Sequence, residues 1–364
     1  MHDERSRVLR EIRRMGKSDE RPAAPADGGE LGATKSESDA LAPIGGMRRR
    51  SFVALAAAAG AALVGIPAAH LFTAARKRPP LLGGGLPTPS EFKAMYSDEF
   101  WSAFKTKFAQ TFETVTPDNA WKWARLQPDG DTWNWTDTDE IMAWAKETGL
   151  KVKVHAPFAS GWSMPEWVRK LSHDDALSAM KRNIEAIGKR YGDRVWLWDA
   201  INEPFHWRKT GPLTIEDAAA AVSAIRGVST AGVIVNEYNL IHRPRELARA
   251  CEFAKGIGAD GIGLQTHSEH RYTRDLLRNA FDYVATTGLD LHLSEIIRPG
   301  KTEEEQAGAY EDVIAAGWKH RAVKSMSFWH LSDCWCWKEF PGTGLLKADL
   351  SEKPAYKLVA ALRQ

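Results

Sequence analysis

The chain alternates short apolar runs with longer segments that carry the apolar period of an amphipathic helix. Eight apolar runs occupy residues 81–86, 111–116, 150–155, 195–201, 232–237, 261–267, 289–295 and 323–332. Helical segments lie between most of them, at residues 136–149, 173–192, 214–227, 243–258, 273–288 and 301–317, and each closes on a glycine. A glycine there favours the left-handed turn that ends a helix. The pattern therefore predicts strands that alternate with helices.

Strands that alternate with helices form parallel βαβ units. Eight such units between residues 81 and 364 fit a (β/α)8 barrel better than a doubly wound sheet. A dinucleotide-binding sheet would also need a G-x-G-x-x-G turn after its first strand, and the glycines within residues 82–86 lack that spacing. We therefore expect an α/β fold, a single TIM barrel over residues 81–364, with tight packing around its first strand.

The first 80 residues have a different composition and are predicted to be a leader and linker outside the barrel. Residues 1–46 are charged and rich in Ala, Gly, Pro and Ser, which cannot bury enough apolar surface to order the chain. A start at Met47 would remove this stretch. Three arginines at positions 48–50 then precede an uncharged apolar run over residues 52–69, which is the order of an export signal.

The residues RRSF at 49–52 resemble the twin-arginine type of export signal. That resemblance implies a signal over residues 48–75, with the twin-arginine translocase as a partner during export. No clean A-x-A cleavage site follows it, so a retained signal that anchors the protein in the membrane stays an alternative. Either route predicts a periplasmic or secreted protein.

The overall composition narrows the possible functions. Lysine and arginine together number 49 against 47 acidic residues, and this near-neutral balance gives no sign of a nucleic-acid partner. Three cysteines provide no disulfide framework. The 15 tryptophans fall mostly around the predicted strand ends, where flat rings can stack on flat, weakly polar ligands.

Polar side chains gather at the predicted strand ends, where a barrel of this type carries its chemistry. Any one of them alone is more often structural than functional, but convergence from seven strands favours a site. From the second to the eighth strand the candidates are Asp118, Asn119, Lys122, His155, Asn202, Glu203, Asn236, Glu237, Tyr238, Gln265, His267, Glu295 and Trp329.

Two of these candidates are acids on strands that lie roughly opposite each other across a small barrel. Glu203 ends the fourth strand and Glu295 ends the seventh. A pair of facing carboxyl groups is what glycosidic bond hydrolysis requires, one protonated to assist the leaving oxygen and one ionised to attack the anomeric carbon. Asn202 is placed to bond a sugar 2-hydroxyl, His267 to hold the nucleophile, and Trp329 to form an apolar floor.

Residues from about 81 to 362 resemble a family 10 glycoside hydrolase, the family of retaining endo-β-1,4-xylanases. TPDNAWKW at 116–123 resembles the family's T-P-E-N-x-M-K-W, and WDAINE at 198–203 its W-D-x-x-N-E. Further similar segments are VNEYNL at 235–240, GIGLQTH at 261–267, FWHLSDCWCW at 328–337 and KPAY at 353–356.

The resemblance implies that Glu203 is the acid/base and Glu295 the nucleophile of a double displacement on xylan. Such a retaining enzyme holds its two carboxyl groups about 5 to 5.5 Å apart. It also implies a monomer that binds a polysaccharide without a metal or cofactor. The implied substrate-binding residues are Asp118, Asn119, Lys122, His155, Asn202, Tyr238, Gln265, His267, Trp329 and Trp337.

Four departures from the family's pattern predict an altered specificity and a slower enzyme. His155 is followed by APFASGWSMPEW, so the Trp and His of the usual W-H-S-Q are absent in register and Trp162 fills part of the gap. Ile297 stands where an acid would orient His267, and Asp118 where a longer Glu is expected. The segment between the fourth and fifth strands is also short.

Two other classes of protein stay open. A metal-dependent barrel hydrolase would use His155, His267, His270 and an acid, but such sites usually need an H-x-H on the first strand, and LLGGGL has none. A sugar-binding barrel that has lost catalysis would explain the missing Trp-His pair, although both carboxylates are present. A related β-glycan hydrolase with altered specificity is the third alternative.

Overall fold

The structure of the chain is a computed structural model that describes residues 79–267 and 272–363. The predicted leader, its signal and nearly all of the linker lie outside these residues. So does His270, which belonged to the metal-site alternative. None of the helices within the described residues has both the length and the apolar character needed to cross a membrane.

Eight parallel strands close into a barrel in the order of the sequence, because β1 pairs with both β2 and β8. This confirms the predicted (β/α)8 fold. The strands are β1 Leu81–Leu86, β2 Thr114–Pro117, β3 Lys151–Ala159, β4 Val195–Asn202, β5 Gly232–Glu237, β6 Gly261–Gln265, β7 Asp290–Ile296 and β8 Val323–Phe328.

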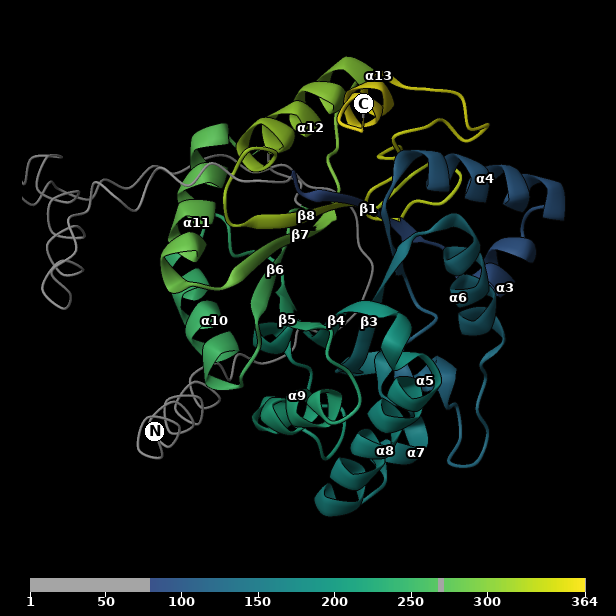
Figure 1. Cartoon of the computed structure of the whole chain (residues 1–364), viewed down its shortest axis with the longest axis vertical. Helices are drawn as coiled ribbons and strands as arrows, with labels where there is room; N and C mark the ends of the chain where they lie inside the picture. Colours follow the sequence, from purple (N-terminus) through teal and green to yellow (C-terminus); the bar gives the residue numbers. More distant parts are fainter. Residues whose placement is uncertain (1–78, 268–271, 364) are drawn as a thin grey trace, which may run out of the picture. The chain divides into compact units, whose positions relative to one another are not determined.

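Helices lie around the strands, as Figure 1 shows. The six predicted helices all form, as α6 Thr136–Thr148, α8 His173–Tyr191, α9 Ala218–Arg226, α10 Pro244–Gly256, α11 Arg274–Thr287 and α12 Glu303–Gly317. The sequence pattern did not predict α3 Pro89–Lys93, α4 Asp98–Thr111, α5 Trp123–Leu126, α7 Glu166–Arg169 and α13 Pro354–Ala361.

Helix α4 explains why the second strand begins three residues later than predicted. The hydroxyl of Ser97 accepts a hydrogen bond from the backbone N–H of Phe100 and so caps the helix. Trp101, Phe104 and Phe108 then recur at helical spacing and are buried. The helix therefore includes Thr111, which the apolar run had assigned to the strand.

Three of the six helix-ending glycines adopt the left-handed conformation, with φ of 74°, 82° and 80° at Gly149, Gly258 and Gly288. The prediction is wrong for Gly192, Gly227 and Gly317, which keep helical backbone angles or lie inside the helix. Two of these three are needed for close packing. A Cβ atom at Gly192 would lie 2.6 Å from the carbonyl oxygen of Val228, and one at Gly317 would lie 3.1 Å from a methyl group of Leu293.

The glycines of β1 allow the first strand to approach its neighbours closely, as predicted. A Cβ atom at Gly84 would overlap the ring of Phe112. One at Gly85 would lie 2.6 Å from the carbonyl oxygen of Trp329 and 3.0 Å from its indole ring. The small residues of β1 therefore leave room for a tryptophan at the carboxyl end of β8.

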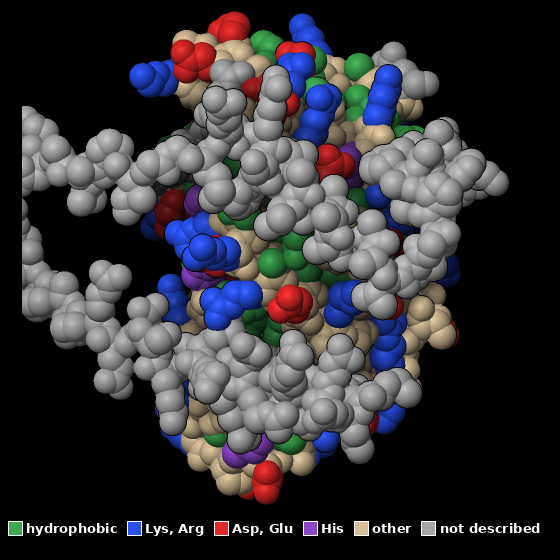
Figure 2. Space-filling model, turned by 90° about the vertical axis from the view of Figure 1, so that its left-hand side faces the viewer, with side chains coloured by type: hydrophobic (Ala, Val, Ile, Leu, Met, Phe, Trp, Pro, Cys, Tyr) green, Lys and Arg blue, Asp and Glu red, His purple; other side chains and the backbone are tan. Residues whose placement is uncertain are grey.

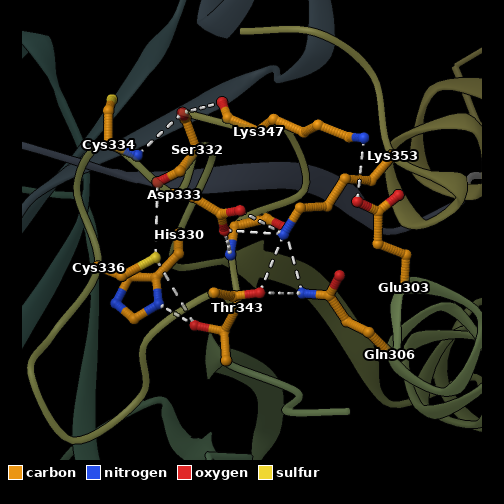
Figure 3. Close-up of polar contacts among 12 residues, drawn as sticks. Glu303, Gln306, His330, Ser332, Asp333, Cys334, Cys336, Thr343, Lys347 and Lys353 are labelled. Carbon is orange, nitrogen blue, oxygen red and sulfur yellow. Dashed lines mark hydrogen bonds and ion pairs between the residues drawn. The ribbon is translucent and has the colours of Figure 1, made fainter. Parts of the chain in front are cut away.

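The eighth strand ends at Phe328, and residues 329–353 form a long segment that we call the β8 loop. Lys353 at its end is buried, and its ammonium lies 2.6 Å from the Asp333 carboxylate and 2.9 Å from the carbonyl oxygen of Gly342. The amide of Gln306 on α12 donates to the same carbonyl at 3.1 Å. Figure 3 shows these contacts converging on one point. The network fixes the shape of a loop whose own β pairing consists of isolated bridges, from Leu346 to Ser332 and to Glu352.

A second contact of the β8 loop involves a buried histidine. His330 Nδ1 donates to the hydroxyl of Thr343 at 2.7 Å, and its Nε2 accepts the backbone N–H of Trp337 at 3.3 Å. Burial lowers the pKa of His330 to about 3, so the ring is neutral and keeps this pattern of one donor and one acceptor. The contact fixes the backbone that carries the Trp337 indole.

The outer surface carries charges of both signs. Figure 2 shows Lys and Arg side chains interspersed with Asp and Glu side chains on one face. Arg274 on α11, for example, pairs with Glu311 at 3.1 Å and with Asp312 at 2.7 Å on α12. Exposed pairs of this kind contribute little stability, about 0 to 1 kcal/mol each. The helices are therefore held mainly by their buried apolar faces.

Candidate active site

A cavity of about 860 Å³ opens at the carboxyl ends of the strands. Eight of the predicted site residues line it, namely Asp118, Asn119, Lys122, His155, Asn202, Glu203, Glu295 and Trp337. The other four, Tyr238, Gln265, His267 and Trp329, lie directly behind this lining, in contact with residues of the wall or with each other. The barrel thus brings together side chains that are up to 219 positions apart in sequence, from position 118 to position 337.

The two candidate carboxylates belong to one hydrogen-bond network. Asn236 Nδ2 donates to Glu295 Oε1 at 2.7 Å and to Asn202 Oδ1 at 2.9 Å. Gln265 Nε2 donates to the same Asn202 oxygen at 3.2 Å and to Glu203 Oε1 at 3.3 Å. Two amides from β5 and β6 therefore connect the acid at the end of β7 with the acid that follows β4.

Glu203 lies at a sharp change of chain direction. Its backbone is left-handed, with φ of 56° and ψ of 52°, and Pro204 follows it. This conformation costs a residue other than glycine about 1 to 2 kcal/mol. The backbone N–H of Glu203 donates to the carbonyl oxygen of Asn236 at 2.8 Å, which holds the turn to β5. The turn aims the carboxyl group into the cavity, so the strain lies at the residue that would do the chemistry.

Glu295 is almost fully buried, and the loss of water around its carboxyl group disfavours the charged form. Burial raises the pKa of its carboxyl group well above the ordinary range, and the nearby Glu203 carboxylate raises it further. Lys153 and the hydrogen bond from Asn236 act in the opposite direction. The Glu203 carboxylate is therefore close enough to act on the Glu295 carboxyl group, and the two side chains form an interacting pair.

Lys153 was not predicted from the sequence as a functional residue. It lies on β3 and is buried inside the barrel, where the carboxylates of Asp199 and Glu295 favour its charged form against the effect of burial. A buried ammonium is stable only when such charges compensate it. The signal in the sequence was the run KVKVH, in which a lysine occupies an inward-facing position of a buried strand.

His155 links the Lys122 ammonium to the Asp199 carboxylate. Its Nδ1 donates to the Asp199 carboxylate at 2.5 Å, and its Nε2 lies 3.0 Å from the Lys122 ammonium. Burial lowers the pKa of His155 to about 4, and the Lys122 charge adds to the effect, so the imidazole is neutral. Both ring nitrogens are therefore used, which leaves none for a metal. No group of three or more His, Cys, Asp or Glu side chains suited to a metal ion occurs in the part of the chain that the structure describes.

The predicted hydrogen bond from His267 to the nucleophile is not formed. His267 Nε2 lies 3.9 Å from Glu295 Oε2 and instead bonds Gln265 Oε1 at 2.7 Å. Burial lowers the pKa of His267 to about 4, and the Arg298 cation lowers it further. The buried Ile297 side chain offers no acceptor. His267 therefore orients Gln265, which in turn contacts Glu203.

A second group lies beside Glu203, and the sequence analysis named its members Glu237 and Tyr238 as candidates but missed His206. The buried Glu237 carboxylate accepts a hydrogen bond from His206 Nδ1 at 2.8 Å, and it also accepts the backbone N–H of Phe205 at 2.8 Å. The imidazole of His206 stacks on Tyr238 with ring centroids 3.8 Å apart, and Tyr238 stacks in turn on His267 at 5.8 Å. These three rings form one wall of the site, and His206 faces the cavity.

Aromatic rings and an acid continue the site from that wall, since the Trp337 ring lies 5.7 Å from the His267 ring between centroids. The Trp329 ring lies 5.5 Å from the His155 ring and 5.9 Å from the Trp337 ring, measured between centroids. Burial raises the pKa of Asp118, although the Lys122 charge and a hydrogen bond from Trp337 oppose the rise. Trp162 is 56% exposed, with the Lys122 ammonium 5.9 Å from its ring centroid. Rings and polar groups alternate on this side, as they do in sites that bind sugars.

A closed barrel with two acids on opposed strands and aromatic rings around them is typical of enzymes that act on carbohydrate chains. Comparison with known sequences gives the family: residues 90–362 match the model of "Glycosyl hydrolase family 10". The chain belongs to this family.

The chain is similar over most of its length to curated members of that family. It is 27% identical over 299 residues to "Endo-1,4-beta-xylanase A" of Caldicellulosiruptor saccharolyticus, covering 69% of this chain and 86% of that protein. It is 26% identical over 283 residues to "Endo-1,4-beta-xylanase 1" of Gibberella zeae, covering 67% and 79%. The fold is also similar to that of native xylanase 10B from Thermotoga maritima, with a TM-score of 0.68 and 22% identity over 78% of this chain and 94% of that one.

The Asn236 amide generates a prediction about pH dependence. A hydrogen bond to the ionised form lowers a pKa, so Asn236→Ala should raise the pKa of Glu295 further by about one to two units, given about 1.5 to 3 kcal/mol for a charged hydrogen bond. If Glu295 must be ionised to react, the acidic limb of kcat/KM against pH moves to higher pH. An aryl glycoside with a good leaving group isolates this limb, because it needs no proton from Glu203.

Asn183→Ala is the matched control for this experiment. Asn183 is a buried asparagine on α8 whose side-chain amide has no hydrogen-bond partner among the described residues, so its loss should leave the pH profile unchanged. An Asn236→Ala enzyme with the wild-type acidic limb would contradict the electrostatic role given to the amide.

Proposed function

We propose that the protein is a retaining endo-β-1,4-xylanase, a hydrolase that cleaves internal xylosidic bonds by double displacement. The observation that carries the proposal is the amide network that joins Glu203 and Glu295 at the floor of an open cavity. The xylanase names of the curated relatives support xylan as the substrate. The openness of the cavity to solvent fits a chain that extends past the site on both sides.

In the first step Glu295 attacks the anomeric carbon, and the glycosidic bond breaks as Glu203 gives its proton to the leaving oxygen. In the second step the ionised Glu203 takes a proton from water, whose oxygen attacks the same carbon and releases Glu295. Asn202 lies next to Glu203 and shares its oxygen with two amide donors, so its own N–H groups are left for a sugar 2-hydroxyl. That contact strengthens as positive charge develops on the ring.

The hydrogen-bond donors favour this assignment of roles. Glu295 receives a 2.7 Å bond from Asn236 and lies near the Lys153 charge, both of which favour its ionised form. Glu203 receives one longer bond, at 3.3 Å, from an uncharged amide. The double displacement requires an ionised Glu295 and a protonated Glu203 when the substrate is bound, and the stronger donors around Glu295 favour that arrangement.

The residues at the end of β3 differ from the family's pattern, and this difference affects which polysaccharide the site should accept. Ala159 and Ser160 stand where the family carries a bulky Trp and His, and both line the cavity. We therefore propose a xylanase with more space beside its reacting sugar than the family pattern gives. Product analysis on xylan, arabinoxylan, mannan, cellulose and aryl glycosides tests the choice of polymer, and activity on mannan or cellulose alone would support the related β-glycan hydrolase instead.

The acid/base role predicts a dependence on the leaving group. Glu203→Ala should lower kcat/KM on unactivated xylan by about 10²- to 10⁴-fold, the usual contribution of a general acid. A dinitrophenyl xylobioside, whose leaving group needs no proton, should still form the glycosyl-enzyme in a measurable burst.

Glu339→Ala serves as the control, because Glu339 is an exposed acid that lines the same cavity. It should keep most of the activity on both substrates. A Glu203→Ala enzyme that degrades xylan at the wild-type rate, or one that loses both substrates equally, would contradict the role of Glu203.

We further propose that the protein acts as a monomer in the periplasm or outside the cell, after export of the barrel in folded form. The support is the RRSF sequence at 49–52 and the apolar run that follows it. The twin-arginine pair is read by its receptor and is more than a positive charge. Residues 1–80 would then be a leader and linker that precede the catalytic domain.

Changing Arg49 and Arg50 together to Lys should therefore keep the xylanase activity in the cytoplasm, while Arg48→Lys should leave export intact. Activity in cytoplasmic and periplasmic fractions is the measurement. Export of the double variant at the normal level would indicate the general secretory route.

A further inference from the structure

The two most exposed large apolar side chains of the described residues face the same cavity. Met95 is 60% exposed and Trp162 is 56% exposed, and both line it. An exposed aromatic ring that lines a cavity offers a flat apolar face to a ligand. Trp162 lies in the β3 loop, residues 160–165, where the sequence departs from the family's pattern. Its indole lies where the usual Trp and His of the family's pattern are absent.

The β3 loop is fixed by the β4 loop, residues 203–214. The hydroxyl of Ser160 accepts the backbone N–H of Arg208 at 2.9 Å, and the backbone N–H of Gly161 donates to the hydroxyl of Thr210 at 3.2 Å. Arg169 on α7 donates to the carbonyl oxygen of Gly161 at 2.7 Å. These bonds hold the backbone on one side of the indole, so the ring is presented to the cavity in a defined position.

The side chain of Arg208 lies beside the β3 loop that carries the Trp162 indole. It lines the cavity, and its Cδ atom is 3.6 Å from the point where a Cβ atom on Gly161 would lie. Within residues 79–267 and 272–363, no carboxylate lies at ion-pair distance from its guanidinium. Of the other two cations that line the cavity, Lys122 contacts His155, and Lys338 lies on the β8 loop outside the recess. An unpaired guanidinium that faces a cavity is suited to a planar, bidentate carboxylate.

The recess beside the indole has room for a substituent on the main chain of the polymer. Ala159 and Ser160 at the end of β3 are small and line the cavity. The recess therefore offers a flat apolar ring for the face of a sugar and a cation for an acidic group, next to Glu203. Glu203 carries its proton in the form that begins the reaction, so it does not repel an anion bound nearby.

We propose that this recess, formed by Ala159, Ser160, Trp162 and Arg208, binds a hexuronate branch carried by the xylan chain. Trp162 stacks on the ring of the branch, and Arg208 pairs with its carboxylate. The inference rests on the proposed xylanase function and adds to it a preference for acidic, branched substrate.

The test compares two polymers that differ only in the charge of the branch, a glucuronoxylan and the same glucuronoxylan with its carboxyl groups reduced to alcohols. The wild-type enzyme should show about tenfold higher kcat/KM on the acidic polymer, because a charged hydrogen bond of about 1.5 kcal/mol corresponds to roughly that factor. Arg208→Gln should bring the ratio close to one, and Arg208→Lys should keep part of it.

Two lysines provide controls for charge alone. Lys209→Gln removes a neighbouring charge from the same loop outside the cavity lining, and Lys338→Gln removes one from the β8 loop inside the lining. Both should keep the wild-type ratio. Trp162→Ala should lower kcat/KM on both branched polymers more than on linear xylohexaose, because the indole contacts the sugar ring of the branch and not its carboxylate. Melting temperatures verify that each variant folds.

A wild-type ratio near one, or a ratio that survives Arg208→Gln, would overturn the inference. So would an equal loss of the ratio in Arg208→Gln and Lys338→Gln, which would indicate a diffuse positive field. If the enzyme cleaves linear xylohexaose but has equal kcat/KM on the acidic and the reduced polymer, this inference is overturned and the proposed function stands. Failure to cleave any xylan would instead overturn the proposed function.

Discussion

The buried carboxylate of Glu295 is the constraint on which the rest of the site depends. An isolated charge at that depth is not stable in a protein, so the surrounding strands must supply donors and a cation. Asn236 on β5 supplies a 2.7 Å hydrogen bond, and Lys153 on β3 supplies the charge. Both are buried residues of strands that do not pair with β7, and the closed barrel brings them to Glu295. The barrel that forms the fold therefore also supplies the groups that compensate the charge of Glu295.

The charges inside the barrel alternate from one wall of the cavity to the nucleophile. Lys122 contacts a neutral His155, which bonds the Asp199 carboxylate. The Lys153 ammonium interacts with the carboxylates of both Asp199 and Glu295. Asp199, Lys153 and Glu295 therefore each have a neighbour of opposite charge, and the Lys122 charge acts on the Asp118 carboxyl group. A change in any member shifts the protonation of the others, which explains why buried polar residues far from the substrate belong to the site.

Local pattern was enough to predict the barrel, because each strand and each of the six long helices shows its own period. It also placed Glu203 and Glu295, since acids that end apolar strands stand out. It failed where contacts join separate segments of the chain. The contact of His206 with Glu237 joins the turn after β4 to the end of β5, and that of Lys353 with Asp333 orders the β8 loop. His267 was given the wrong partner because Gln265, two residues away on the same strand end, lies closer than Glu295.

The central claim is that Glu295 forms a covalent bond to the sugar and that Glu203 assists both steps. The stereochemistry of the first-formed product tests this most directly, because two displacements at one carbon restore its configuration and a single displacement inverts it. Proton NMR of a β-linked xylo-oligosaccharide, recorded during the first minutes of hydrolysis, separates the two anomers before they equilibrate. The account predicts an initial β-anomer; an initial α-anomer would contradict the roles of both carboxylates.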